Sequence, residues 1–237
     1  MDKKVVKGIL IFIVNLITSI RLIGAFSLPI IYHYYGANIT SIIIIILFLT
    51  DAIDGFLARL FKVSTFFGSL MDAMSDKLLN MISFIILGLE YNIMFAPLII
   101  EIAILYTTYS TYRYGGNVRT LTIGKYKTII LDVLVILSFL LLSLPNFNIT
   151  SKFIISIINY TDIIIHTFSI IITIFCIITL HKYLIENKKA RNNPKPITIK
   201  LRNKTKKEVK LILKQLFDTE YYNEHKTESI MKQLYLK

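Results

Sequence analysis

Long apolar stretches separated by short polar segments dominate the first 185 residues of the chain. A helix needs about 20 largely apolar residues to cross the hydrocarbon core of a bilayer. Six stretches reach that length, at residues 12–35, 38–61, 67–89, 93–113, 123–145 and 161–185. The pattern therefore predicts an all-α integral membrane protein with six transmembrane helices, and the overall hydrophobic content of 54% supports this class.

The segment 186–237 has a different character. It carries 14 Lys and Arg against 6 Asp and Glu, so most of the chain's net charge of +12 lies there. Thr205 and Glu208 have the spacing of a capping box. The positions that follow form one apolar face, made by Val209, Ile212, Leu213, Leu216 and Phe217. A second short amphipathic helix is expected at about 228–236.

Two domains follow from this contrast: a six-helix membrane domain at 1–185 and a basic tail at 186–237. A basic amphipathic helix beside a membrane domain favours anionic lipid headgroups as its partner, and not nucleic acid. The same face could instead pack into a small cytosolic lobe or form a dimer contact.

Basic residues also predict the orientation in the membrane. Three lysines precede the first span, two basic residues join the second and third, and four join the fourth and fifth. The three opposite loops hold only Lys152. Both termini are therefore expected in the cytoplasm of a multi-pass protein of the cell membrane.

The polar positions that interrupt the second and third spans are four aspartates. Asp51 and Asp54 are three residues apart and Asp72 and Asp76 are four apart, so each pair shares one helix face. If the chain reverses near Val63, Asp54 lies level with Asp72, and the other two lie about one turn deeper. The four carboxylates would then face one another in two layers at the cytoplasmic end of the helices.

Four facing carboxylates repel one another, and a divalent cation removes that repulsion. Oxygen ligands suit Mg²⁺ or Mn²⁺, and four carboxylates are enough for one or two such ions. The chain has only four His and one Cys, Cys176, which argues against a His/Cys zinc site and allows no disulfide within the chain. A metal site of this kind can polarise a phosphoryl group.

The order D-x-x-D-G-x-x-A-R followed by G-x-x-x-D-x-x-x-D resembles the signature of the CDP-alcohol phosphatidyltransferases. Its eight positions are filled by Asp51, Asp54, Gly55, Ala58, Arg59, Gly68, Asp72 and Asp76. The resemblance implies that the aspartates bind the metal and that Asp72 and Asp76 are also catalytic, with Asp76 either completing the metal ligands or acting as the general base. It further implies that Gly55, Ala58, Arg59 and Gly68 contact the CDP-linked lipid, and it suggests a homodimer.

Polar residues in the first span repeat at three-residue intervals, at Asn15, Thr18 and Arg21. One interpretation is an arginine that snorkels toward the membrane surface, with helix–helix hydrogen bonds along the stripe. The stripe also resembles the first helix of the same family, where it borders the nucleotide site. Thr18 and Arg21 are therefore further candidates for binding the CDP-lipid.

The loop between the fourth and fifth spans carries Arg113, Arg119, Lys125 and Lys127 beside several glycines. Basic groups near a helix N-terminus bind anions, although the same residues also serve as a topology signal. The run Gly124–Thr128 resembles the bacterial phosphatidylglycerophosphate synthases within the family. On that resemblance the four basic residues bind the phosphate of the acceptor.

The expected reaction is transfer of a phosphatidyl group from CDP-diacylglycerol to glycerol 3-phosphate, with release of CMP. Inositol phosphate, phosphatidylglycerol and serine are alternative acceptors within the family. A membrane transporter that binds cations through its acids is the alternative from another class, and an inactive membrane scaffold is a third. The transporter gives no reason for Gly55, Ala58, Arg59 and Gly68, and the presence of all four acids argues against the scaffold.

Overall fold

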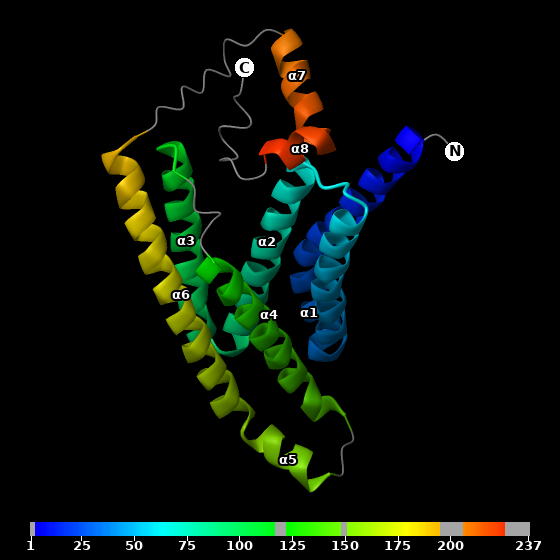
Figure 1. Cartoon of the computed structure of the whole chain (residues 1–237). Helices are drawn as coiled ribbons and strands as arrows, with labels where there is room; N and C mark the ends of the chain where they lie inside the picture. Colours follow the sequence, from blue (N-terminus) through cyan, green and yellow to red (C-terminus); the bar gives the residue numbers. More distant parts are fainter. Residues whose placement is uncertain (1–2, 117–121, 148–150, 195–205, 226–237) are drawn as a thin grey trace.

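The computed structural model describes residues 3–116, 122–147, 151–194 and 206–225 (Figure 1). Within these ranges the chain is helical and contains no strand, which confirms the predicted all-α class. The elements are α1 (Lys3–Leu60), α2 (Phe66–Glu90), η1 (Asn92–Met94), α3 (Phe95–Arg113), α4 (Thr122–Ser143), η2 (Leu144–Asn146), α5 (Lys152–Asn159), α6 (Thr161–Asn192), α7 (Lys206–Phe217) and α8 (Thr219–His225). The expected second tail helix at 228–236 and the capping residue Thr205 lie outside the described residues.

Helix α1 is two antiparallel segments joined at Gly36. This residue has φ 69° and ψ −168°, a left-handed conformation that glycine adopts without a Cβ clash. In the first turn after Gly36, Thr40 Oγ1 donates a hydrogen bond to the Gly36 carbonyl at 2.8 Å. Figure 1 shows the chain running down the first segment and back up the second. The predicted spans at 12–35 and 38–61 are these two segments.

The two segments of α1 cross closely at Gly24. A Cβ built on Gly24 would lie 2.6 Å from Leu47 Cδ2 of the second segment. Leu47 is 4% exposed, and Ala25 and Leu28 next to the crossing are fully buried. The reversal at Gly36 therefore places residues that are far apart in sequence, such as Arg21 and Asp51, side by side.

A second reversal follows at residues 61–65 and leads into α2. Thr65 caps α2, because its hydroxyl accepts a hydrogen bond from the Gly68 amide at 3.0 Å. Lys62 adopts φ 54° in the turn. The predicted reversal near Val63 is confirmed, and Val63 itself is buried.

Helix α2 is central and packs against α1, α3, α4 and α7. Its inward face is buried along its second half, where Phe84 and Leu87 are inaccessible to solvent. Helices α3 and α6 also pack along each other, and α4 packs on α1 and α6. The core of the bundle therefore lies around α2 (Figure 1).

The outer surface of the bundle is strongly apolar. Large hydrophobic side chains such as Ile23, Phe26 and Ile99 are more than half exposed. A soluble monomer rarely exposes such an extended apolar surface, whereas lipid is a favourable environment for it. Among the described residues, four helical stretches are long and apolar enough to cross a membrane: Val5–Ala58, Asn92–Arg113, Ile123–Asn146 and Thr161–Asn192. The first of these contains the reversal at Gly36.

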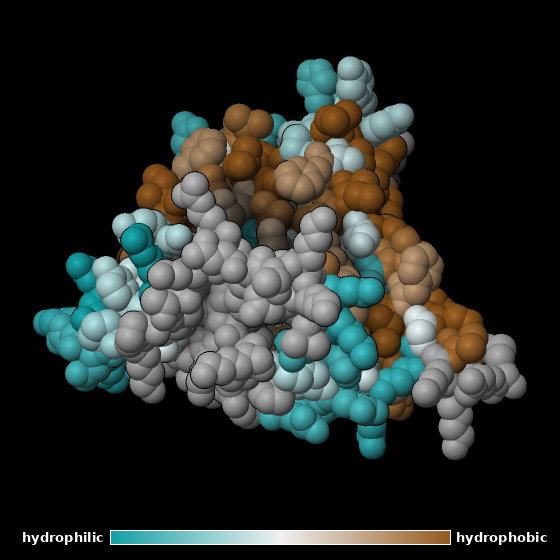
Figure 2. Space-filling view, turned by 90° about the horizontal axis from the view of Figure 1, so that it is seen from above, coloured by the Kyte–Doolittle hydropathy of each residue, from teal (hydrophilic) through white to brown (hydrophobic). Residues whose placement is uncertain are grey.

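The start of α1, the end of α6 and helices α7 and α8 all lie at one end of the molecule (Figure 1). Figure 2 looks down on this end and shows hydrophilic residues along its lower and left edges, with hydrophobic residues over much of the upper part. The loop between α1 and α2 lies at the same end, so residues near that loop face the more polar end of the bundle.

Candidate active site

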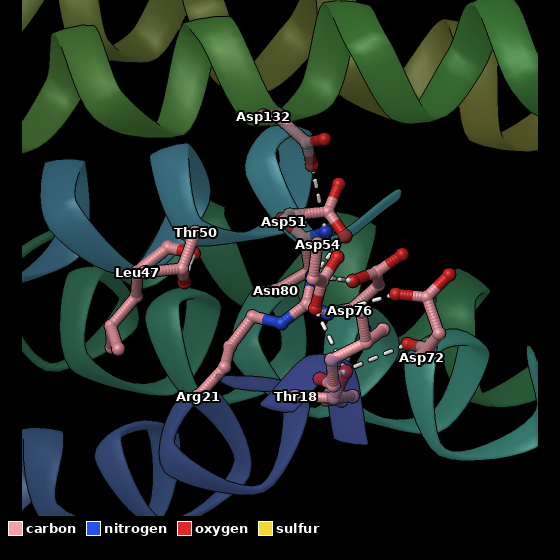
Figure 3. Close-up of polar contacts among 12 residues, drawn as sticks. Thr18, Arg21, Leu47, Thr50, Asp51, Asp54, Asp72, Asp76, Asn80 and Asp132 are labelled. Carbon is pink, nitrogen blue, oxygen red and sulfur yellow. Dashed lines mark hydrogen bonds and ion pairs between the residues drawn. The ribbon is translucent and has the colours of Figure 1, made fainter. Parts of the chain in front are cut away.

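The four aspartates meet around one arginine. The Arg21 guanidinium donates through Nη1 to Asp76 Oδ1 at 2.7 Å and also pairs through Nη1 with Asp51. Through Nη2 it donates to Asp54 Oδ2 at 2.9 Å and to Asp72 Oδ1 at 2.8 Å. Figure 3 shows the Arg21 side chain extending from the first segment of α1 into the cluster. The two reversals of the chain thus bring three helical segments to one point.

Arg21 is completely buried, which requires paired charge around it. Asp54 is 2% exposed, whereas the side chains of Asp51, Asp72 and Asp76 are between 29% and 41% exposed. One side of the cluster is therefore enclosed by protein and the other is open to an incoming molecule.

Thr18 fixes the most buried of the four acids. Its hydroxyl donates to Asp54 Oδ2 at 2.8 Å and lies 3.2 Å from the carbonyl of Val14, one turn earlier. Thr18 is 2% exposed. The second oxygen of Asp54, Oδ1, is buried and has no hydrogen-bond partner in the structure. A buried carboxylate oxygen without a partner is costly, so Asp54 is suited to a cationic ligand.

The cluster forms part of the wall of a cavity of about 360 Å³. The acid-bearing faces of α1 and α2 and the loop between them supply most of its lining. The motif residues that line the cavity are Asp51, Asp54, Gly55, Ala58, Gly68, Asp72 and Asp76. Thr18 and Asn15 line it from the first segment of α1. Small residues beside the acids leave this space open, as the sequence predicts.

Gly68 shows why the space near the acids is tight. A Cβ built on it would lie 2.9 Å from Asn15 Oδ1 and 3.1 Å from Thr65 Oγ1, the capping oxygen of α2. Any larger residue at position 68 would push against both groups. Glycine at this position therefore permits close contact between α1 and α2 beside the cavity.

The aspartates fit a divalent cation. One carboxylate oxygen each from Asp51, Asp72 and Asp76 lie within 4.8 Å of one another. Asp54, the fourth predicted ligand, is not part of this group, and its Oδ1 is buried without a hydrogen-bond partner. Carboxylate oxygens are the ligands that Mg²⁺ and Mn²⁺ prefer. Three of the four aspartates predicted as metal ligands therefore form a cluster that could hold a divalent cation.

The basic residues expected to bind the acceptor differ in their exposure to solvent. Lys127 is buried and pairs with Glu101 on α3, whose carboxylate also accepts from Cys176 Sγ at 3.3 Å. Lys125 and Arg113 are exposed at the ends of α4 and α3. None of these three is among the described residues that line the cavity.

Two predicted site residues have side chains outside the described part of the structure. Arg119 lies outside the described residues. The backbone of Arg59 belongs to the last turn of α1, but its side chain is not described.

Other polar residues near the site were not predicted to belong to it. Asn80 Nδ2 donates to Asp132 Oδ1 at 2.8 Å and links α2 to α4 (Figure 3). The intramembrane polarity of both residues was a visible signal, but their pairing depends on how α4 packs. Tyr222, from helix α8 in the tail, also lines the cavity. No motif in the tail indicated that.

The fold and the site define a helical membrane protein with a carboxylate site suited to divalent cations and phosphate esters. The chain belongs to the CDP-alcohol phosphatidyltransferase family, whose model matches residues 11–175. No match was found among curated proteins or solved structures.

Family membership makes the protein a transferase of phospholipid biosynthesis, with a CDP-linked alcohol as donor and an alcohol as acceptor. The family uses divalent metals, in agreement with the aspartate cluster. The match favours the transferase over the cation transporter considered from the sequence.

Proposed function

We propose that the protein transfers a phosphatidyl group from CDP-diacylglycerol to glycerol 3-phosphate, giving phosphatidylglycerophosphate and CMP. The observation that carries the donor half is the meeting of four aspartates from α1 and α2 on one cavity wall. This arrangement suits a diphosphate that is bound through cations, which is the reactive part of a CDP-linked lipid.

In this proposal Asp51, Asp54 and Asp72 hold one or two Mg²⁺ or Mn²⁺ ions, and Asp76 completes the ligands or acts as general base. A bound ion would offset the negative charge that develops on the leaving CMP. The oxygen of the acceptor hydroxyl bonds to the lipid-linked phosphorus, and Asp76 takes the proton from that hydroxyl. The bond from that phosphorus to the CMP oxygen breaks, and CMP leaves.

Neighbouring residues position these groups. Arg21 holds one oxygen of each aspartate, and Thr18 holds Asp54. Both therefore act through the carboxylates. Thr18 also lines the cavity, whereas the fully buried Arg21 is not among its described lining residues, so the CDP-lipid contact expected from the sequence is kept for Thr18 alone. Gly55 and Gly68, together with Ala58, leave room for the nucleotide, and the motif arginine at position 59 contacts a phosphate.

The acceptor site is proposed from the basic loop between α3 and α4. Lys125 and Arg113 are exposed, so both are accessible to an acceptor phosphate. Lys127 already has a buried carboxylate partner in Glu101, which favours a structural part for it. Inositol phosphate uses the same phosphate chemistry and is the second candidate, ahead of serine and phosphatidylglycerol.

We further propose six membrane spans with both termini and the active site on the cytoplasmic side. An even number of crossings agrees with the start of α1 and the end of α6 lying at one end of the bundle (Figure 1). The tail at 186–237 is proposed to meet anionic lipid headgroups, and the protein to form a homodimer.

The test is CMP release by the purified protein in detergent, with CDP-diacylglycerol and Mg²⁺ or Mn²⁺. Glycerol 3-phosphate, inositol phosphate, serine and phosphatidylglycerol are offered one at a time. We expect release that depends on glycerol 3-phosphate and stops on chelation. Release with a different acceptor would overturn the acceptor assignment and leave the family chemistry intact.

A further inference from the structure

Helices α7 and α8 of the tail pack on the start of α2. The rings of Phe67 and Phe217 lie 4.8 Å apart between centroids. Phe66, the first residue of α2, makes edge contacts with Tyr221 at 5.9 Å and with Tyr222 at 4.8 Å. Phe66 is 6% exposed, and these two tail residues are among the groups packed on it. Aromatic pairs of this geometry stabilise a contact beyond simple burial.

Asp218 sets the direction of α8 after the break from α7. Its carboxylate Oδ1 accepts hydrogen bonds from the amides of Glu220 at 2.9 Å and Tyr221 at 3.3 Å. Its carbonyl accepts from the Tyr222 amide at 3.1 Å. This cap and the contact with Phe66 hold Tyr222 from two sides, and its side chain becomes part of the cavity wall.

Tyr222 differs from the rest of that wall in two ways. Among the described lining residues it is the one from outside residues 11–175, which the family model covers. It is also the one aromatic side chain among them. The other lining residues from the loop and the start of α2 are Val63, Ser64, Thr65, Gly68 and Ser69, which offer no π-face to the cavity.

The place of Tyr222 along the cavity matches the base end of a bound nucleotide. Phe66 precedes Asp72 by six helical residues, or about 9 Å along α2, roughly the length of a ribose with its base. With the diphosphate at the aspartates, the acyl chains must extend toward the apolar flanks of the bundle. The polar nucleoside would then extend toward the end of the bundle where α7 and α8 lie (Figure 1).

We propose that the ring of Tyr222 packs against the nucleobase of the CDP-linked donor, so that the C-terminal tail forms part of the donor site. This inference rests on the donor half of the proposed function and not on the identity of the acceptor. Stacking of a base on an aromatic ring tolerates any base, because every base has a π-face, and the contact contributes to affinity.

The test is calorimetric titration of the full chain in detergent with Mg²⁺, using CDP and inorganic pyrophosphate as separate probes. Tyr222→Leu removes the ring but keeps an apolar side chain, and Tyr222→Phe keeps the ring. We expect Tyr222→Leu to bind CDP about tenfold more weakly. Tyr222→Phe and the wild type should bind CDP alike, and all three should bind pyrophosphate equally, because pyrophosphate has no base.

Tyr221→Leu is the matched control. Tyr221 also contacts Phe66 but is not among the residues that line the cavity, so its loss tests the docking of α8 alone. Equal CDP affinity in the wild type and Tyr222→Leu would overturn the inference. So would an equal loss in Tyr221→Leu, or a parallel loss of pyrophosphate binding. Because no acceptor is present, failure of the glycerol 3-phosphate assay leaves these outcomes unaffected.

Discussion

Thr18→Val isolates the contribution of one hydrogen bond to the aspartate cluster. Valine has the shape of threonine and the same branching at Cβ, so the substitution opens no cavity beside Asp54. It removes the 2.8 Å bond from the Thr18 hydroxyl to Asp54 Oδ2. That oxygen keeps only the Arg21 contact, and Oδ1 already has no partner. Asp54 therefore becomes freer to rotate away from its position in the cluster.

The expected size follows from the charge on the acceptor. A hydrogen bond to a charged group contributes about 1.5–3 kcal/mol. When a residue that hydrogen-bonds to a metal-binding carboxylate is lost, metal affinity typically falls about 10- to 100-fold, which corresponds to about 1.4–2.7 kcal/mol. The two estimates agree. We therefore expect Thr18→Val to need about 10- to 100-fold more Mg²⁺ or Mn²⁺ for half-maximal CMP release.

The assay is a metal titration of CMP release at saturating donor, with thermal unfolding measured in parallel. Thr18→Ser retains the hydroxyl and is expected to keep a requirement close to that of the wild type. An unchanged metal requirement in Thr18→Val would refute the idea that this hydroxyl orients Asp54. An equal rise in Thr18→Ser would show that packing at this position, and not the hydrogen bond, matters.

Four further substitutions test other parts of the protein. Asp76→Asn should abolish CMP release while calorimetry shows retained CDP binding, and near-normal turnover would reject Asp76 as the base. Gly68→Ala should lower the unfolding temperature, because overpacking costs about 1–3 kcal/mol, against a gain of about 1 kcal/mol in helix propensity. Gly8→Ala is the control, because no atom lies within 4 Å of the new Cβ, and it should not lower the unfolding temperature. Lys127→Met leaves a buried carboxylate unpaired and should destabilise the protein by about 3–5 kcal/mol. Lys125→Met should keep its unfolding temperature and raise KM for glycerol 3-phosphate, and the reverse pattern would assign the acceptor contact to Lys127.

The aspartate site could be predicted largely from spacing alone. Acids three and four residues apart share a helix face, and a turn halfway between Asp54 and Asp72 makes the two faces meet. The structure has that turn at 61–65 and brings all four carboxylates to one cavity. Local periodicity was sufficient here because one short loop fixes the depth of both helices.

Contacts between distant segments could not be predicted in the same way. Arg21 lies 55 residues before Asp76, and their contact depends on the reversal at Gly36 as well as on the α1–α2 turn. The hydrophobic pattern indicated a break between two spans near Gly36 but not which faces would meet after it. The partner of Lys127 depends likewise on the packing of α4 against α3 and α6.

The central place of Arg21 changes how the motif is understood. With all groups ionised, one guanidinium among four carboxylates leaves a net charge of three negative charges. Arg21 therefore cannot neutralise the cluster, but it engages one oxygen of each aspartate and so fixes the orientation of all four. In the proposed function, this remaining negative charge attracts divalent cations and, through them, the diphosphate of the donor. On this proposal the arginine of the first helix organises the site, and the aspartates of the motif supply its chemistry.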